Sequence, residues 1–438
     1  MKSRTKIFAV AGNPVLHSMS PAMLNAAFAK NGIDAVYTRI TASRAEEIMS
    51  CAKEMGLAGF NVTSPFKEEI VPLLDDVDDL TKKIGAVNTV VLEEGRIKGY
   101  NTDAEGVVGA LLAAKVALSG SKAVVLGGGG AAKAAVFGLL SEGAEVVVIN
   151  RTFEKAQALA QKAGCRASRL EDIERELESA HILVSCISSG QRLIEPGLLR
   201  KGLTVLDANY STETLLVKDA RERGCKVADG REWLLFQGAG AFRRFTGSEP
   251  PLAAMRRALR AGRLSRKKNI AFVGFMATGK STVAKIVSEK ADLPLIDLDA
   301  EIECKAGTKI KEIFENEGEE TFRRMEMAEI RRITPDSRAI IACGGGAVLN
   351  EKNRTSLKNN CIVVWLWAGA ESILKRVGNN GDRPLLNEMR EESAVKELLD
   401  ARLPLYACCS DLVIRSEGTG PEEIARKVYE ESRKFLDN

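Results

Sequence analysis

Two glycine-rich segments in this chain have the residue types and spacing that bind phosphate groups. The first, residues 127–132, reads Gly-Gly-Gly-Gly-Ala-Ala after the apolar run 123–126. Such glycines permit a tight turn and close approach of the backbone to a pyrophosphate, so this segment fits a dinucleotide. The second, Gly274 to Ser281, follows the apolar run 269–273 and fits a nucleoside triphosphate. A chain that carries both segments predicts two enzymes joined end to end.

The second segment matches the full pattern of a phosphate-binding loop. We expect its backbone N–H groups to surround the phosphates, Lys280 to bridge the outer phosphates and Ser281 to hold Mg²⁺. The motif does not identify the molecule that is phosphorylated. The predicted nucleotide contacts in this loop are Gly274, Ala277, Thr278, Gly279, Lys280, Ser281 and Thr282.

The residues after the run 145–149 distinguish the two nicotinamide dinucleotides. An NAD site usually has an acidic residue there, which binds the ribose hydroxyls. This run instead ends in Asn150-Arg151-Thr152, and the nearest acidic residue, Glu154, lies past its end. A basic helix start is the ordinary alternative, but a guanidinium suits the extra phosphate of NADP, which we favour. The predicted dinucleotide contacts are Gly127, Gly129, Gly130, Ala131, Asn150, Arg151, Thr152 and Lys155.

Turns ahead of the first glycine segment hold a high density of hydroxyl and amide side chains. They fall in residues 12–21, 59–67, 85–89 and 99–103. Local capping explains any one of these side chains. As a set they predict a pocket of hydrogen-bonding groups that also contains one lysine and one aspartate.

These segments together resemble the shikimate dehydrogenase family, over about residues 6–262 and in five separate motifs. That family reduces 3-dehydroshikimate to shikimate with NADPH. The resemblance implies that Lys67 and Asp103 are the catalytic pair. A hydride delivered to a ketone leaves an alkoxide, and a lysine held by a carboxylate can supply its proton. The resemblance also implies substrate contacts from Ser18, Ser20, Asn61, Thr63, Asn88, Tyr210 and Gln237.

Three places depart from that family's pattern, one of which is the segment 184–190, where the family has an Asn-Ala-Thr stretch. Leu24 stands where the family usually has histidine, and Trp233 stands where it usually has methionine near the nicotinamide. The larger ring of Trp233 predicts altered packing near the cofactor.

Segments after the phosphate-binding loop resemble shikimate kinase as a set, from residue 269 to the end. They are 297–299, 322–326, 344–346, 382–386 and 402–406. That family transfers the γ-phosphate of ATP to the 3-hydroxyl of shikimate. The resemblance implies that Asp299 binds substrate hydroxyls and assists deprotonation, that Arg323 and Arg402 bind the substrate carboxylate, and that the backbone of Gly344, Gly345 and Gly346 approaches the substrate. It implies that Asp297 supports Mg²⁺ and that Arg376 lies near adenine. It also implies that Lys280 is catalytic and that Arg383 closes on the phosphates from a mobile lid.

The product of the first reaction is the substrate of the second, so the two resemblances converge on one molecule. We therefore expect a bifunctional shikimate dehydrogenase–shikimate kinase that uses NADPH, ATP and Mg²⁺. Two alternatives stay open. In one, the first half is a quinate or aminoshikimate dehydrogenase. In the other, one of the two halves is a degenerate binding module. The catalytic residues named above are all intact, which argues against the second alternative.

Runs rich in Val, Ile and Ala alternate with helical segments, which is typical of parallel sheets covered by helices. The resemblances imply an α/β protein: a two-lobed N-terminal dehydrogenase with a Rossmann-like NADP lobe, and a C-terminal P-loop kinase of the nucleoside-monophosphate-kinase type. The expected boundaries are a substrate lobe at 1–105 with a return of 233–262, an NADP lobe at 106–232, a linker at 262–268 and a kinase domain at 269–438. The halves 1–262 and 266–438 are expected to fold separately.

Composition excludes several classes of function. The net charge, 63 − 59 = +4, is too small to argue for nucleic acid, and the basic residues 256–257 and 266–268 are expected to be solvated. No apolar run approaches the roughly 20 residues that span a bilayer. Two histidines and scattered cysteines make a structural metal site improbable. The first residues lead into a strand rather than a signal peptide, so the expected location is the cytoplasm. The expected partners are small-molecule substrates, with no nucleic acid and no membrane, and the sequence does not give the oligomeric state.

Overall fold

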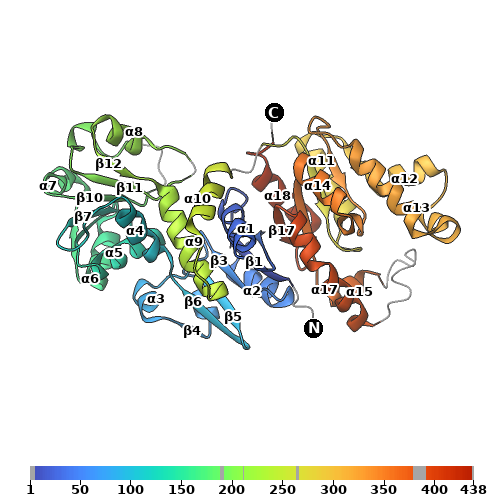
Figure 1. Cartoon of the computed structure of the whole chain (residues 1–438), viewed down its shortest axis with the longest axis horizontal. Coiled ribbons are helices and arrows are strands. Elements are labelled where there is room, and N and C mark those ends of the chain that lie inside the picture. The colour runs from blue at the N-terminus through green and yellow to red at the C-terminus, as the bar shows by residue number, and fades with distance from the viewer. Residues whose placement is uncertain (1–4, 188–191, 211, 263–265, 378–390, 437–438) are drawn as a thin grey trace. The chain divides into compact units, whose positions relative to one another are not determined.

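The computed structural model describes residues 5–187, 192–210, 212–262, 266–377 and 391–436 (Figure 1). The chain divides into two compact units, and each is discontinuous in sequence. Unit 1 comprises Met1–Pro21, Asp34–Ser64 and Arg263–Asn438, and unit 2 comprises Ala22–Ile33 and Pro65–Gly262. The N-terminal strands therefore belong to the same unit as the C-terminal part of the chain.

The strands of unit 1 lie side by side in the order β14-β15-β13-β16-β17-β2-β1-β3. Every neighbouring pair is parallel. Parallel strands with helices on both faces are buried on both faces and read as continuous apolar runs, as β16 does. Their bounds are β1 (Lys6–Gly12), β2 (Ala35–Thr41), β3 (Gly59–Val62), β13 (Ile270–Val273), β14 (Leu295–Asp297), β15 (Ile340–Ala342), β16 (Ile362–Trp367) and β17 (Leu412–Arg415).

Helices connect these strands, as parallel pairing requires. Helix α1 (Ser20–Lys30) begins in unit 1 and belongs to unit 2 from Ala22 onward. The phosphate-binding loop lies between β13 and the start of α11, at the carboxyl end of that strand. The other helices of unit 1 are α2 (Ala45–Glu54), α11 (Lys280–Ala291), α12 (Leu298–Ala306), α13 (Ile310–Arg332), α14 (Glu351–Asn360), α15 (Ala370–Val377), α17 (Glu392–Cys409) and α18 (Pro421–Ser432).

Unit 2 contains a six-stranded parallel sheet in the order β12-β11-β10-β7-β8-β9. This is the Rossmann order, in which the first strand, β7, lies centrally beside the point where the order reverses. Unit 2 also contains β4 (Asp76–Val77), β5 (Thr89–Glu93) and β6 (Arg96–Tyr100). The strands of the large sheet are β7 (Lys122–Leu126), β8 (Glu145–Ile149), β9 (Arg166–Ser168), β10 (Ile182–Ser185), β11 (Thr204–Asp207) and β12 (Lys226–Ala228).

Alternate residues of β7 face two separate cores. Ala123 and Val125 pack in one cluster, and Val124 and Leu126 pack in the other. Helices cover both clusters, which is why this strand reads as an unbroken apolar run. The helices of unit 2 are α3 (Asp79–Ile84), α4 (Asp103–Ala113), α5 (Gly130–Ser141), α6 (Phe153–Ala163), α7 (Ile173–Glu178), α8 (Leu215–Glu222), α9 (Gly230–Thr246) and α10 (Leu252–Ala261).

The expectation that Lys267 is solvated is wrong. This residue is only 9% exposed. Its backbone N–H donates to Phe435 O at 2.9 Å, its Nζ donates to Cys361 O at 2.7 Å, and Nζ lies 3.7 Å from the carboxylate of Asp411. The ammonium tolerates burial because carbonyl and carboxylate oxygens replace its water. Its neighbour Lys268 is more exposed and pairs with Asp336.

Among the helices of the described part of the chain, none has the length and apolar character needed to cross a membrane.

Candidate active sites

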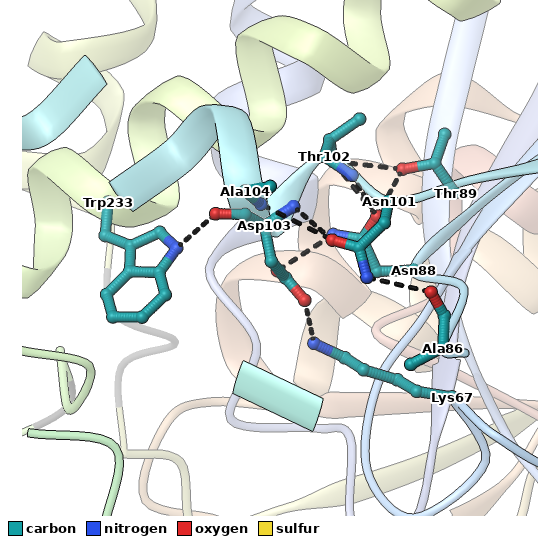
Figure 2. A network of polar contacts seen from close by, with 9 residues as sticks. All are labelled: Lys67, Ala86, Asn88, Thr89, Asn101, Thr102, Asp103, Ala104 and Trp233. Atoms are coloured by element: carbon teal, nitrogen blue, oxygen red, sulfur yellow. Dashed lines mark hydrogen bonds and ion pairs between the residues drawn. The ribbon is translucent and has the colours of Figure 1, made fainter. Parts of the chain in front are cut away.

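Lys67 and Asp103 form a direct ion pair in unit 2, with an asparagine as third member (Figure 2). Lys67 Nζ donates to Asp103 Oδ2 at 2.5 Å, and Asn88 Nδ2 donates to Asp103 Oδ1 at 2.8 Å. The Asp103 side chain is 4% exposed, and that of Lys67 is 20% exposed. The aspartate is thus buried and fixed, while the side chain of Lys67 is partly exposed.

The loops around this pair are held by their own asparagines, as Figure 2 shows. Asn101 Oδ1 accepts the N–H of Asp103 at 3.1 Å, and its Nδ2 donates to Ala86 O at 2.8 Å. Asn88 Oδ1 accepts the N–H of Thr102 at 2.7 Å. These hydrogen bonds hold the turn before α4 and so fix the position of the Asp103 carboxylate at the start of that helix.

Trp233 of α9 contacts the same turn. Its Nε1 donates to the backbone oxygen of Asp103 at 2.9 Å, and its ring is buried. A Cβ at Gly106 would lie 2.5 Å from Trp233 Cδ1, so α4 has room for this ring only because it has glycine there. The sequence singled out Trp233 for its size, but gave no sign that it binds the backbone of Asp103.

The dinucleotide segment leads from β7 into α5, whose first residue is Gly130. Gly127 has φ 127°, which favours glycine, and an added Cβ would meet Cys186 at 3.3 Å. A cavity of about 340 Å³ is lined by Gly127, Gly128, Asn150 and Arg151, among others. The side chain of Arg151 is exposed at this cavity. Helix N–H groups and a guanidinium beside a cavity fit a phosphate-bearing dinucleotide.

In unit 1, the Ser18–Ser20 segment and the Asn61–Thr63 segment come from the ends of neighbouring strands. Ser18 Oγ donates to Ser20 Oγ at 3.3 Å, and both serines are buried. Tyr37 OH donates to Asn61 Oδ1 at 2.6 Å. Thr63 packs so closely on Gly12 that a Cβ there would lie 2.2 Å from its methyl carbon. These polar groups are therefore placed by packing and by each other.

Two side chains of the loop Gly274 to Ser281 donate hydrogen bonds to the carbonyl oxygen of Phe275. Lys280 Nζ donates to that oxygen at 2.8 Å, and Thr278 Oγ1 donates to it at 2.9 Å. Gly279 has φ 91° and Ala277 has φ 61°, so two residues of the loop are left-handed. Ser281 and Thr282 are exposed at the start of α11. A helix N-terminus with a lysine at its first position fits an anionic phosphate.

A second cavity, of about 670 Å³, collects the remaining charged residues of unit 1. The following predicted site residues line it: Asp297, Asp299, Arg323, Gly344, Gly345, Gly346 and Arg402. Asp297 Oδ1 accepts the N–H of Asp299 at 3.1 Å, which fixes the start of α12. Carboxylates and guanidinium groups that face one cavity can bind hydroxyls and a carboxylate of a small polyol acid.

Glu326 also lines this cavity, although the sequence analysis gave it no role. It is 1% exposed, and its Oε2 accepts from Arg323 Nη1 at 3.0 Å. Burial raises the pKa of Glu326, although the charge of Arg323 acts in the opposite direction. Gly346 leaves room for Arg323, since an added Cβ would lie 2.3 Å from its Nη1. The spacing of Arg323 and Glu326 on α13 is the signal that would have identified the pair.

Four family models match the chain. The shikimate dehydrogenase substrate binding domain matches residues 10–90, the shikimate/quinate 5-dehydrogenase matches 110–214 and the shikimate 5'-dehydrogenase C-terminal domain matches 230–260. The shikimate kinase model matches residues 276–433. Shikimate dehydrogenase (NADP(+)) of Methanosarcina mazei is 42% identical over 271 residues, which cover 58% of this chain and 96% of the relative. The chain belongs to the shikimate dehydrogenase family. Its C-terminal part is a shikimate kinase domain.

Other relatives of the dehydrogenase part are also shikimate dehydrogenases. The enzyme of Pyrococcus furiosus is 41% identical over 273 residues, covering 61% of this chain and all of that protein. Two solved shikimate dehydrogenases superimpose on it. That of Aquifex aeolicus gives a TM-score of 0.57 at 38% identity and covers 59% of this chain and 99% of its own. That of Thermus thermophilus, in complex with NADP(H) and shikimate, gives 0.55 at 37% and covers 58% and 99%. The α/β fold class predicted from the sequence is confirmed.

The remaining predicted residues of the dehydrogenase part and the kinase domain are placed as follows. Gln237 lies on α9, one turn after Trp233, and Tyr210 follows β11; both are partly exposed. Thr152 and Lys155 are exposed beside Arg151. Arg376 donates from Nη1 to Ala277 O at 3.2 Å, which joins α15 to the phosphate-binding loop. Arg383 and the segment 382–386 lie outside the described residues.

Proposed function

We propose that this chain reduces 3-dehydroshikimate to shikimate with NADPH and then phosphorylates the 3-hydroxyl of shikimate with ATP. The observation that carries the proposal is the presence, in one chain, of a shikimate dehydrogenase part with a Lys67–Asp103 pair and a shikimate kinase domain with a charged cavity. The product of the first activity is the substrate of the second.

In the dehydrogenase part, bound NADPH supplies the hydride. Lys67 then donates a proton to the alkoxide oxygen that forms. Asp103 holds the ammonium of Lys67 in place, and Asn88 holds the carboxylate of Asp103. A proton donor positioned in this way contributes roughly 10²–10⁴-fold to a rate. The residues proposed to hold the substrate's carboxylate and hydroxyls are Ser18, Ser20, Asn61, Thr63, Asn88, Tyr210 and Gln237.

The preference for NADP is assigned to Arg151, with Lys155 beside it. Arg151 lines the cavity at the end of β8, where a ribose phosphate would need a cation. One neighbour at 30% identity is a quinate dehydrogenase in complex with NAD. We favour NADP because the chain has Arg-Thr at this strand end rather than an acidic residue. We favour shikimate because the relatives at 41–42% identity are shikimate dehydrogenases.

In the kinase domain, bound ATP–Mg²⁺ supplies the phosphoryl group. Asp299 accepts the hydroxyl proton of shikimate, and Arg323 and Arg402 hold its carboxylate. Lys280 and Arg383 are proposed to neutralise the transferred phosphoryl group. Ser281 and Asp297 would hold Mg²⁺, and Arg376 would lie at the adenine.

The nine unpaired cysteines support a location in a reducing compartment, which we propose to be the cytoplasm. The partners proposed are the small-molecule substrates 3-dehydroshikimate and shikimate.

The test supplies the purified chain with 3-dehydroshikimate, NADPH and ATP–Mg²⁺ and follows shikimate 3-phosphate. Each co-substrate is omitted in turn. We expect shikimate without ATP, and shikimate 3-phosphate only when all are present. A parallel assay of quinate with NAD and NADP separates the rival dehydrogenase. Faster turnover of quinate with NAD than of shikimate with NADP would contradict the proposal.

A further inference from the structure

The loop between β1 and α1 carries Ser18 and leads into Ser20, the first residue of α1. Its internal hydrogen bonds include Ser18 N–H to Val15 O at 2.9 Å. The backbone N–H groups of Val15 and Leu16 point away from the turn and are buried, so they need acceptors. The acceptor that they find lies more than four hundred residues further along the chain.

Glu431 of α18, in the kinase domain, supplies that acceptor. Its Oε1 accepts from Val15 N at 2.9 Å, and its Oε2 accepts from Leu16 N at 2.9 Å and from Val15 N at 3.0 Å. Glu431 is 4% exposed. Burial raises the pKa of this carboxyl, while the two backbone N–H groups lower it. A carboxylate that accepts backbone N–H groups makes charge-assisted bonds, which are stronger than neutral ones.

A second buried charge holds the other end of the same loop. Arg39 of β2 donates to Ser18 O from Nε at 3.1 Å and from Nη2 at 2.7 Å, and its Nη1 donates to Asp411 O at 3.1 Å. Asp411 lies just before β17 of the kinase domain. One guanidinium therefore joins the backbone of Ser18 to the backbone of the kinase domain.

The surrounding contacts fix α18 and β17 against the dehydrogenase strands. β17 pairs with β2 through Val413↔Ile40 and Ile414↔Thr41. Lys427 of α18 lies 3.6 Å from Glu47, and both side chains are largely buried. These contacts hold α18, and with it Glu431, in place beside the β1–α1 loop.

We infer that Glu431 is a positioning residue for the dehydrogenase reaction: it holds the Val15–Leu16 backbone so that Ser18 and Ser20 stay placed to bind 3-dehydroshikimate. The inference rests on the proposed function, because it takes both serines as substrate contacts. A residue of the kinase domain would then set the substrate affinity of the other enzyme in the chain.

The experiment compares Glu431→Ala and Glu431→Gln with Glu430→Ala in the full chain. Glu430 is the matched control: it is the neighbouring glutamate of α18, exposed, and paired with Arg426. The quantities are kcat and KM for 3-dehydroshikimate, KM for NADPH, and kinase activity on added shikimate.

We expect Glu431→Ala to raise KM for 3-dehydroshikimate on the order of tenfold, because a lost hydrogen bond to a charged group corresponds to at least about one power of ten. Glu431→Gln keeps one acceptor oxygen and should give a smaller rise. The KM for NADPH, kcat and kinase activity should stay within about twofold, as should all values for Glu430→Ala.

A KM for 3-dehydroshikimate within twofold of wild type in a folded Glu431 variant would overturn the inference. So would a parallel fall of kcat and kinase activity, which general unfolding produces. If Glu431→Ala does not fold, Glu431→Gln decides by the same criteria. A wild-type chain that does not reduce 3-dehydroshikimate contradicts the proposed function instead, so the two failures are distinct.

Discussion

At the scale of single residues, the dehydrogenase chemistry depends on how Lys67 is held. Within the described part of the chain, Lys67 forms an ion pair with Asp103, whose second carboxylate oxygen accepts a hydrogen bond from Asn88. This arrangement leaves the partly exposed ammonium facing outward as a donor. In the kinase domain, a buried carboxylate likewise holds a cation, because Glu326 accepts a hydrogen bond from Arg323, and both residues line the 670 Å³ cavity.

Replacing Lys67 by alanine removes the proposed proton donor. We expect dehydrogenase kcat to fall on the order of 10²–10⁴-fold while kinase activity on added shikimate is retained. Lys82→Ala, at an exposed lysine of α3, is the control and should change neither activity. Near-normal reduction by Lys67→Ala would remove Lys67 from the mechanism.

Ala277 offers a stability test in the phosphate-binding loop. Its φ of 61° is left-handed, a conformation that costs an L-residue roughly 1–2 kcal/mol. Ala277→Gly removes this strain but loosens the unfolded chain, so we expect a net gain of about 1 kcal/mol in unfolding free energy. Ala401→Gly, at an exposed position within α17, should lose about the same amount. Destabilisation by both variants would show that Ala277 is not strained.

At the scale of elements, strand ends and helix starts place the charged groups. The turn from β8 into α6 carries Arg151, and the turn from β13 into α11 carries Lys280. Both turns lie at the carboxyl ends of parallel strands, where α/β proteins bind ligands.

Arg151→Ala tests the first of these turns. We expect it to lower kcat/KM for NADPH by on the order of tenfold or more and to leave kcat/KM for NADH nearly unchanged, because only NADPH has the extra phosphate. Arg175→Ala, at an exposed arginine of α7, is the control. Equal losses with both cofactors would show that Arg151 does not read the phosphate.

Helix α13 gives a prediction on pH. The folded-state pKa of Glu326 is raised above its ordinary value of 4.5 by burial. The folded chain therefore binds this proton more tightly than the unfolded chain, and the stabilisation, complete below about 4.5, is lost as pH rises through the folded pKa. The melting temperature of wild type relative to Glu326→Gln should thus fall as pH rises through that window. A difference between the two proteins that stays constant across this pH range would refute the assignment.

Local sequence patterns predicted most of this arrangement and missed contacts between distant residues. The apolar runs located β7, β8 and β13, and the glycine motifs located both phosphate-binding turns. Nothing near Glu431 indicates that its carboxylate binds the backbone of Val15, because the contact exists only after both segments have folded. The burial of Lys267 is missed for the same reason, because a lysine in the sequence does not show which distant carbonyl groups will accept its hydrogen bonds after folding.

At the scale of the whole molecule, unit 1 combines the N-terminal strands with the kinase domain. The sequence favours separable halves, 1–262 and 266–438. The pairing of β2 with β17 gives a reason to expect otherwise, because a separate first half would expose the β2 edge and leave the Val15 and Leu16 N–H groups without Glu431. Exposed strand edges favour aggregation.

We therefore expect residues 1–262, expressed alone, to melt at a lower temperature than the dehydrogenase part of the intact chain and to associate with itself. Size-exclusion chromatography and thermal unfolding measure both properties. A monomeric fragment with the thermal stability and substrate KM of the intact chain would show that the two halves are independent.

The central claim is that one chain performs both reactions on one molecule. Its most direct measurement is the formation of shikimate 3-phosphate by the purified chain from 3-dehydroshikimate, NADPH and ATP–Mg²⁺, with Lys67→Ala and Lys280→Ala beside it. We predict shikimate 3-phosphate from the wild type, no conversion of 3-dehydroshikimate by Lys67→Ala, and accumulation of shikimate by Lys280→Ala. If the wild type forms no shikimate 3-phosphate, or if Lys280→Ala forms it as fast as the wild type, the account is contradicted.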